Sequence, residues 1–181
     1  TEQLNLTTKE AENFWPIYNA HEDEKHKIYE SSLAKRKEIN IEKLSEKEKI
    51  ECSWHVLASG LSSIVHGEQG AMLVASQLAT CAPTYNAKLY AASQTFDEAR
   101  HVEVYHKYLR ERIGWIYPIM PGLKLLLDKI LTDPRWDLKF IGMQIIIEGL
   151  ALAAFQTTKE TSNCPLLRQL VHYVIRDEAR H

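Results

Sequence analysis

The sequence predicts an all-α fold, a four-helix bundle with an N-terminal helical appendage. Glycine and proline are scarce, with 7 and 6 residues in a chain of 181, which favours long helices over many short strands. From residue 51 onwards apolar residues recur at helical spacing, with few turn signals between them. The pentapeptide Asp-Glu-Ala-Arg-His occurs twice, and its glutamate and histidine are spaced to share one helix face.

The character of the chain changes near residue 51. Residues 1–50 carry 9 Lys and Arg, 11 Asp and Glu, and few apolar residues, whereas residues 51–181 are far more apolar. We therefore expect a charged helical N-terminal segment, 1–50, and a bundle domain, 51–181.

Helix-start signals occur twice in the N-terminal part. Thr7–Glu10 reads as a capping box with Leu6 as a hydrophobic staple, which predicts a helix from Thr8 towards Ser31 with a kink at Pro16. Ser45–Glu48 is a second predicted helix start.

The bundle domain reads as helical throughout. The predicted helices span residues 51–80, 85–113, 121–131, 135–161 and 166–181. Proline- and glycine-containing breaks separate them at residues 81–83, 114–118, 133–134 and 162–165.

The two copies of the pentapeptide are Asp97–His101 and Asp177–His181. The sequence offset between them equals the offset between Glu68 and Glu148, so each of these glutamates precedes its pentapeptide by the same distance. The chain thus carries, twice, a glutamate followed by Glu-x-x-His, the six-ligand set of a carboxylate-bridged dinuclear metal centre in a helix bundle. The predicted metal ligands are Glu68, Glu98, His101, Glu148, Glu178 and His181.

The positions of the turns support this interpretation. In the sequence, the break at Pro83 is equally far from Glu68 and Glu98, and Asn163 is equally far from Glu148 and Glu178. Each pair of helices therefore folds into an antiparallel hairpin whose glutamates meet at one level. At a helical rise of about 1.5 Å per residue, that level lies about 22 Å from the turn.

The apolar surroundings of the glutamates favour a cation. Glu148 lies in the apolar run Ile145–Phe155, where a lone ionised carboxylate would cost several kcal/mol. Four carboxylates with two neutral imidazoles carry four negative charges, which two divalent ions cancel. Oxygen-rich ligation with one imidazole per metal suits iron or manganese better than zinc, so two Fe ions or a Mn/Fe pair are the predicted cofactors.

Charged residues inside each pentapeptide are candidates for supporting the ligands. A ligating imidazole usually donates its second N–H to a carboxylate or carbonyl. Asp97 and Asp177 are the candidate acceptors, and Arg100 and Arg180 would hold these aspartates as ion pairs.

On these motifs, residues 60–181 resemble ferritin-like di-iron carboxylate proteins of the oxygenase and ribonucleotide-reductase-small-subunit type. The Asp-Glu-x-Arg-His form is similar to that of bacterial multicomponent monooxygenase hydroxylases. The resemblance implies that Glu98 and Glu178 bridge the metals and that Glu68 and Glu148 are more terminal. Such proteins continue the helix that here stops at His181, so the resemblance also implies truncation at the C-terminal end.

The function that this resemblance implies is an O2-activating non-haem di-iron oxidoreductase. Its substrate would be small and largely apolar or aromatic, for hydroxylation, N-oxygenation or desaturation. An electron-donor protein or another reductant is the expected partner, and a homodimer is possible. Two alternatives stay open: a radical-generating or ligand-binding Mn/Fe oxidase, and a non-catalytic metal-binding or iron-handling protein.

Tyr105 and five apolar residues near the predicted ligands could each be functional or simply part of the core. Tyr105 lies one turn after His101, the spacing of the redox tyrosine in radical-generating small subunits that this site resembles, and it is equally a core residue. Five apolar residues lie a turn from ligand glutamates and could line a substrate pocket or simply form core: Ile64, Met72, Ile145, Leu152 and Phe155.

Composition limits the compartment and the partners. A net charge of -2 argues against nucleic-acid binding, and three widely spaced cysteines argue against a disulfide framework, so a cytoplasmic protein is expected. The run Ile141–Phe155 is too short to span a bilayer. Residues 4–48, however, resemble the opening helix of Spy/CpxP-like periplasmic stress proteins, which would imply a periplasmic location.

Overall fold

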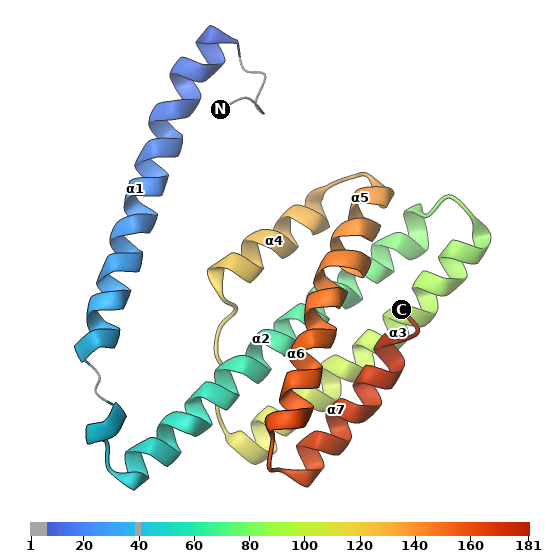
Figure 1. Cartoon of the computed structure of the whole chain (residues 1–181). Helices are drawn as coiled ribbons and strands as arrows, with labels where there is room; N and C mark the ends of the chain where they lie inside the picture. The colour runs from blue at the N-terminus through green and yellow to red at the C-terminus, as the bar shows by residue number, and fades with distance from the viewer. Residues whose placement is uncertain (1–6, 39–40) are drawn as a thin grey trace. The chain divides into compact units, whose positions relative to one another are not determined.

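The computed structural model describes residues 7–38 and 41–181, and within these ranges it contains helices and no strand, which confirms the predicted all-α class (Figure 1). The chain divides into two compact units, Thr1–Ile50 and Glu51–His181, which are described separately.

The first unit contains one long helix, α1 (Thr8–Glu38), and the short 3-10 helix η1 (Ile41–Lys43). The predicted capping box is present, since the Thr7 amide donates to Glu10 Oε2 at 2.8 Å and the Glu10 amide donates to Thr7 Oγ1 at 3.4 Å. The helix extends past the predicted end at Ser31, and Pro16 lies inside it. The proposed staple residue, Leu6, lies outside the described residues.

The second predicted helix start is also confirmed. Helix α2 (Glu46–Cys81) begins after Ser45, whose amide donates to Glu48 Oε2 at 2.8 Å while Ser45 Oγ accepts from the Glu48 amide at 3.3 Å. The predicted start at Ser45 and the predicted helix 51–80 are thus parts of one element.

The remaining helices follow the predicted breaks closely. In chain order they are α3 (Tyr85–Tyr108) with the π-helix η2 (Leu109–Ile113), α4 (Pro121–Thr132), α5 (Trp136–Phe140), the π-helix η3 (Ile141–Ile147), α6 (Glu148–Thr161) and α7 (Pro165–Glu178). Helices α2 and α3 form one antiparallel hairpin and α6 and α7 another, as predicted from the turn positions (Figure 1).

Two apolar clusters fill the interior of the second unit. The first contains Leu61, Val65, Tyr105, Tyr108, Leu109, Phe155, Leu167, Val171 and Val174. The second contains Ala71, Val74, Leu78, Ala91, Leu127, Ile130, Met143 and Ile147. Along α2, Glu68 lies between residues of the first and the second cluster, and along α3 Glu98 also lies between residues of the two clusters. A polar layer therefore separates the two apolar clusters.

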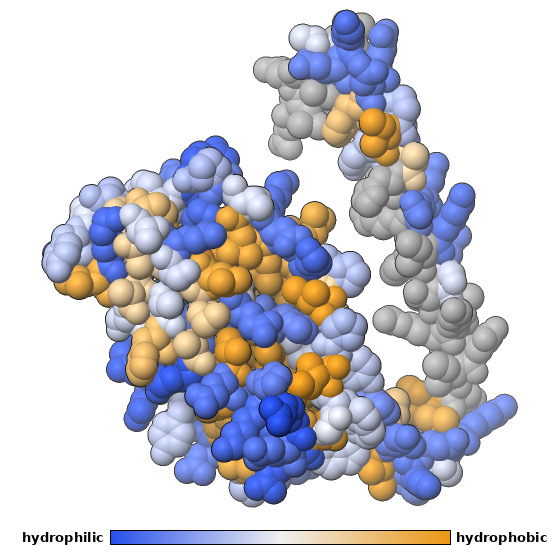
Figure 2. Space-filling view, turned by 180° about the vertical axis from the view of Figure 1, so that it is seen from behind, coloured by the Kyte–Doolittle hydropathy of each residue, from blue (hydrophilic) through white to orange (hydrophobic). Residues whose placement is uncertain are grey.

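Apolar side chains also reach the surface of the second unit. Figure 2 shows hydrophobic areas interspersed with hydrophilic ones on the face that it presents. Exposed large hydrophobic residues include Tyr85, Phe96, Leu125, Ile145 and Leu150. More than half of the surface of a folded protein is ordinarily apolar, so scattered residues of this kind do not by themselves define an interface.

The segment before Glu148 departs from a regular α-helix. The sequence predicts one continuous helix over 135–161, whereas the structure inserts the π-helical turn Ile141–Ile147 directly before Glu148. Such turns are rare and often lie at functional sites. The combined helix Trp136–Thr161 has 26 residues and is long and apolar enough to cross a membrane by length and composition alone, unlike the shorter run considered in the sequence.

Helix α4 lies outside the repeated ligand motif and packs on α2. A Cβ atom at Gly70 would lie 2.9 Å from Leu127 Cδ1 and 3.1 Å from its Cγ, and Leu127 is buried. Beyond α4, the buried Lys139 ammonium donates to the carbonyls of Ile130 and Leu131, both at 2.9 Å, and to Gln77 Oε1 at 2.6 Å. These bonds satisfy carbonyls at the end of α4 and hold it to α2.

We predict that Gly70→Ala lowers the free energy of unfolding by about 1 kcal/mol, because overpacking against Leu127 outweighs the gain in helix propensity. Gly67→Ala is the matched control on the same helix, since a Cβ there has no atom within 4 Å. It should leave stability unchanged or raise it by up to about 1 kcal/mol. Urea unfolding measures both, and equal effects would contradict the close α2–α4 contact.

Candidate metal centre

Six side chains from four helices converge between the two apolar clusters. Helix α2 supplies Glu68, α3 supplies Glu98 and His101, Glu148 opens α6, Glu178 ends α7, and His181 follows shortly after it. The four glutamates are between 0 and 7% exposed, and the His181 side chain is 4% exposed. All six predicted ligands therefore meet in a buried layer.

The six residues form two overlapping sets of four. One set contains Glu68, Glu98, His101 and Glu178, and the other contains Glu98, Glu148, Glu178 and His181. Within each set, one ligand atom from every residue lies within 4.8 Å of the others. Glu98 and Glu178 belong to both sets, whereas each remaining carboxylate and each histidine belongs to one. If each set held one metal ion, the two ions would share two carboxylates.

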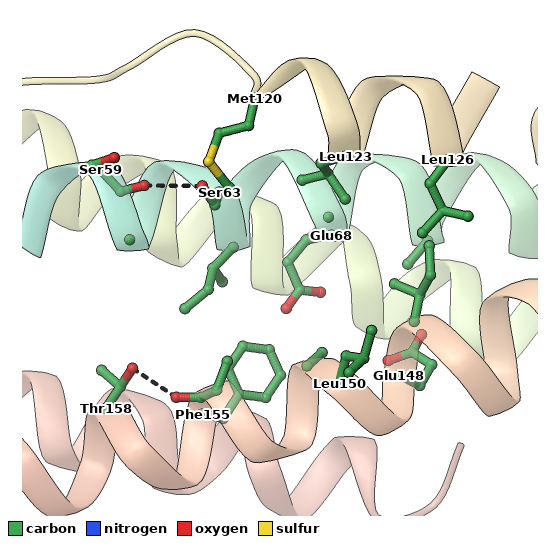
Figure 3. A pocket seen from close by; sticks show the side chains of 17 residues that line it. Ser59, Ser63, Glu68, Met120, Leu123, Leu126, Glu148, Leu150, Phe155 and Thr158 are labelled. Atoms are coloured by element: carbon green, nitrogen blue, oxygen red, sulfur yellow. Dashed lines mark hydrogen bonds between the residues drawn. The ribbon is translucent and has the colours of Figure 1, made fainter. Parts of the chain in front are cut away.

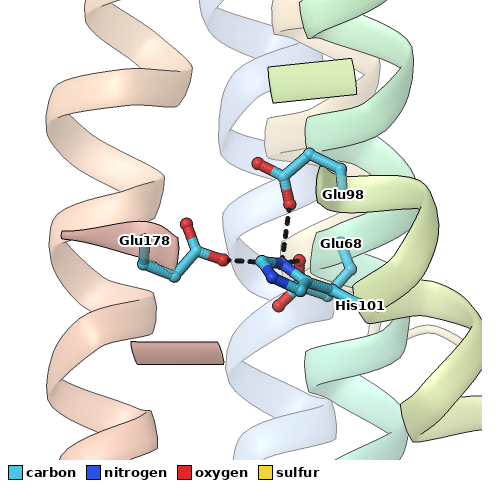
Figure 4. Close-up of side chains that lie close together, drawn as sticks. All are labelled: Glu68, Glu98, His101 and Glu178. Atoms are coloured by element: carbon cyan, nitrogen blue, oxygen red, sulfur yellow. Dashed lines mark hydrogen bonds and ion pairs between the residues drawn. The ribbon is translucent and has the colours of Figure 1, made fainter. Parts of the chain in front are cut away.

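Each imidazole presents its Nδ1 atom to the carboxylates. His101 Nδ1 lies 3.0 Å from Glu178 Oε1, 3.3 Å from Glu98 Oε2 and 3.4 Å from Glu68 Oε2 (Figure 4). His181 Nδ1 lies 2.8 Å from Glu178 Oε2 and 3.3 Å from Glu98 Oε1. Nδ1 is therefore the nitrogen that each ring offers to a cation, and Nε2 is left for a supporting group.

The supporting aspartates are paired crosswise between the two pentapeptides. His181 Nε2 lies 3.4 Å from Asp97 Oδ2, an aspartate of the other pentapeptide. His101 Nε2 lies 3.7 Å from Asp177 Oδ2, which is an ion-pair distance but too long for a hydrogen bond. The sequence indicated the residue types, but their crossed pairing depends on how the hairpins pack.

The two arginines occupy the positions expected of them. Arg100 binds Asp97 in its own pentapeptide and donates to Asp177 Oδ2 at 3.3 Å, so one guanidinium holds both aspartates. Arg180 binds Asp177. The hydroxyl of Tyr90 donates to the backbone carbonyl of His181, which ties the residue after α7 to α3.

A glutamine pair supports the site and was not anticipated from the sequence. Gln94 is 1% exposed, and its Nε2 donates to Glu98 Oε1 at 3.0 Å and to Glu148 Oε1 at 3.4 Å. Gln144 Nε2 donates in turn to Gln94 Oε1 at 2.7 Å. Both glutamines lie one turn before a ligand glutamate, and that spacing in an apolar helix is the signal that could have found them.

The carboxylates differ in their protonation. Burial raises the pKa of Glu148 to about 10, reinforced by the charges of Glu178 and Glu98, and burial also raises the pKa of Glu68 well above its usual value. Burial acts in the same direction on Glu98 and Glu178, but hydrogen bonds from the two histidines outweigh it and lower the pKa of both.

The pKa values of the two histidines shift in the opposite direction to those of ordinary buried imidazoles. Burial lowers the pKa of His101, but hydrogen bonds to Glu178, Glu68 and Glu98 overcome that effect and raise it to about 12. The same balance raises the pKa of His181 to about 10. Without a cation, two imidazolium groups would thus neutralise Glu98 and Glu178, and protons would neutralise the other two carboxylates. Two divalent cations can replace these four protons without changing the net charge.

Tyr105 lies beside this layer. It is 0% exposed, its hydroxyl has no hydrogen-bond partner among the described residues, and its ring stacks on Phe155 at a centroid distance of 6.0 Å. Burial raises the pKa of its hydroxyl, with a further contribution from the charges of Glu68 and Glu178. The structure therefore places a neutral, unpaired phenol near the carboxylates.

A cavity of about 470 Å³ reaches the ligand layer from one side (Figure 3). It lies among α2, α4 and α6, and its lining includes Glu68 and Glu148 among mostly apolar and small side chains. Of the five apolar residues considered in the sequence, Ile64 and Phe155 line it, whereas Met72, Ile145 and Leu152 do not. Helix α4 contributes Leu123 and Leu126, which periodicity alone could not place over the site.

Comparisons with protein-family models, with curated proteins and with solved structures find no match to this chain. Its site is therefore interpreted from its own residues and geometry.

We predict that binding of two divalent ions at pH 7 releases about four protons, one from each imidazolium and one from each of Glu68 and Glu148. Since the pKa is about 10 for Glu148, about 10 for His181 and about 12 for His101, these protons compete with the metal at pH 7, and metal affinity should rise steeply between pH 7 and pH 10. Calorimetric titration in buffers of different ionisation enthalpy counts the protons. Release of one proton or none would contradict this charge balance.

We also predict that Asp97→Asn weakens metal binding through His181 and not through His101, by about 10- to 100-fold. A double-mutant cycle tests this, because Asp97→Asn should couple to His181→Ala and be additive with His101→Ala. Asp177→Asn is the matched control with the opposite expectation. Coupling of each aspartate to the histidine of its own pentapeptide would show that the crossed pairing is wrong.

Proposed function

We propose that residues 51–181 form a ferritin-like di-metal bundle whose centre holds two iron ions and uses O2 to oxidise a small, largely apolar molecule. The observation that carries this proposal is the contact between the ligand layer and the cavity. Glu68 and Glu148 belong to the two metal sets and also line a space of about 470 Å³, a volume typical of small-molecule sites.

The donor set supports iron or manganese as the cations. Each set of four offers three carboxylates and one imidazole, and oxygen-rich ligation of this kind suits these metals better than zinc, which favours tetrahedral sites rich in sulfur and nitrogen. The shared carboxylates, Glu98 and Glu178, would hold both ions, while Glu68 and Glu148 would each hold one. When bound, two iron ions supply the one-electron steps that O2 activation needs.

The chain's own residues orient the ligands and line the cavity. Asp97 would fix the tautomer of His181 by accepting from Nε2, and Arg100 holds that aspartate in an ion pair. Gln94 holds one oxygen of Glu98 and one of Glu148. The mostly apolar lining of the cavity provides the contact surface for an apolar substrate.

The overall reaction balances only with a reductant. Hydroxylation of a C–H bond places one oxygen atom of O2 in the product and the other in water. Two electrons come from the C–H bond and two from an electron-donor protein or a small reductant. N-oxygenation has the same requirement. Desaturation removes two hydrogen atoms from the substrate and forms two water molecules, so it also takes two electrons from the reductant and two protons from solvent.

One observation favours a second function, generation of a tyrosyl radical at Tyr105 by an Fe/Fe or Mn/Fe centre. Its hydroxyl is buried, has no partner among the described residues and lies one turn beyond His101. Electron paramagnetic resonance after exposure of the metal-loaded protein to air separates the two functions. A tyrosyl signal that Tyr105→Phe abolishes would favour radical generation.

We predict that the full chain loaded anaerobically with Fe(II) consumes O2 rapidly, and that Glu148→Gln reduces the rate by at least about 100-fold because one carboxylate of the second set is lost. The matched control is Glu160→Gln, an exposed glutamate on the same helix. An oxygen electrode measures the rate.

Equal rates in the two variants would contradict the ligand role of Glu148. Binding of two irons without O2 consumption would instead favour an iron-handling protein.

A further inference from the structure

The cavity is elongated and has a second polar region away from the metal ligands. Ser59 and Ser63 on α2 and Thr158 on α6 line it together with Glu68 and Glu148 (Figure 3). At a helical rise of about 1.5 Å per residue, Ser59 and Glu68 lie about 13 Å apart along α2, the length of an extended alkyl chain of about ten carbons. Because α6 runs in the opposite direction, Thr158 lies at the same end as Ser59.

Small residues create this channel. Gly60, Ser63, Gly67 and Ala71 follow one another at helical spacing on the cavity side of α2, and Ala151 and Ala154 line the α6 side. A methyl group at Gly60 or Gly67 would meet no atom within 4 Å. The pocket therefore extends from Glu68 towards Ser59 and Thr158 between small side chains (Figure 3).

The hydroxyl groups at the far end offer lone pairs. Ser63 Oγ donates its hydrogen to the Ser59 carbonyl at 3.1 Å, and Thr158 Oγ1 donates to the Ala154 carbonyl at 2.8 Å. With their hydrogens directed along their own helices, both oxygen atoms keep acceptor capacity for a ligand. A ligand group at this end must therefore donate a hydrogen bond.

The charge of the lining excludes an anionic ligand group at that end. The described lining residues include two carboxylates and no lysine, arginine or histidine. A ligand carboxylate beside Ser63 and Thr158 would find no cation among the described lining residues, and the hydroxyl hydrogens of both residues are already donated to backbone carbonyls.

We propose that the cavity takes a linear apolar molecule with one uncharged hydrogen-bond donor, of the primary-alcohol class, and that its hydroxyl donates its single hydrogen to Ser63 Oγ or to Thr158 Oγ1 while the alkyl chain extends towards Glu68. This proposal rests on the proposed function, because it names the substrate class of the same site.

The test compares three probes of matched length: decanol, its isomer nonyl methyl ether, which only accepts hydrogen bonds, and decanoate, which is charged. Calorimetry measures binding of decanol and the ether to the full chain, both freed of metal and after anaerobic loading with Fe(II). Decanoate is compared on the metal-free chain, where no iron can bind its carboxylate. Decanol should bind about five- to tenfold more tightly than the ether, the usual net effect of one hydrogen bond. Decanoate should bind at least about tenfold more weakly than decanol.

Two sets of variants locate the binding site. Ser63→Ala combined with Thr158→Val removes both acceptors and should bring decanol to the affinity of the ether, with ether binding unchanged. Gly60→Leu should fill the far end and abolish binding of both probes. Gly122→Leu is its matched control, since Gly122 is also helical, has open space around it and does not line the cavity.

Equal binding of decanol and the ether, tighter binding of decanoate, or no binding of any probe would overturn this inference. The result is independent of the proposed function, which is judged by O2 consumption. Selective alcohol binding without O2 consumption would leave the cavity assignment standing and remove the oxidase role. O2 consumption without alcohol selectivity would do the reverse.

Discussion

Four carboxylates buried between two apolar clusters are the constraint on which the rest of this structure depends. Glu98 is fully buried, and Glu68, Glu148 and Glu178 are nearly so. Four negative charges at such separations repel strongly in a poorly solvated interior, so the fold persists only if positive charge accompanies them. Without a cation, protons on His101, His181, Glu68 and Glu148 meet this need, and two divalent cations can replace these four protons. Asp97 then holds the imidazole ring of His181, and Arg100 binds both Asp97 and Asp177.

The symmetry of the chain follows from this requirement. Each copy of the repeated motif folds into a hairpin that delivers two glutamates and one histidine, and neither hairpin alone neutralises its own carboxylates. Pairing the hairpins brings Glu98 and Glu178 between both histidines and lets Asp97 reach His181. Residues outside the repeated motif then shape the cavity that leads to the candidate metal ligands. Helix α4 covers one side of α2, and small residues on α2 and α6 leave the cavity open.

Sequence alone predicted the parts governed by local rules. Helical periodicity and proline-containing breaks predicted the helices of residues 51–181. The capping boxes at Thr7 and Ser45 predicted two helix starts. The six ligands could be named because Glu-x-x-His spacing and the common offset are visible in one dimension. The crossed aspartates, the Gln94–Gln144 pair and the cavity lining could not, since each depends on how two distant helices pack. The π-helical turn before Glu148 was missed because its apolar sequence, Ile141–Ile147, equally suits an α-helix.

The most direct test of the central claim is a crystal structure of the iron-loaded protein with anomalous diffraction measured at the iron absorption edge. The charge balance and the two overlapping ligand sets predict two anomalous peaks, both bound by Glu98 and Glu178. One peak should also be bound by Glu68 and His101 through Nδ1, and the other by Glu148 and His181. A single peak, no peak, or two peaks that share no carboxylate would contradict the account.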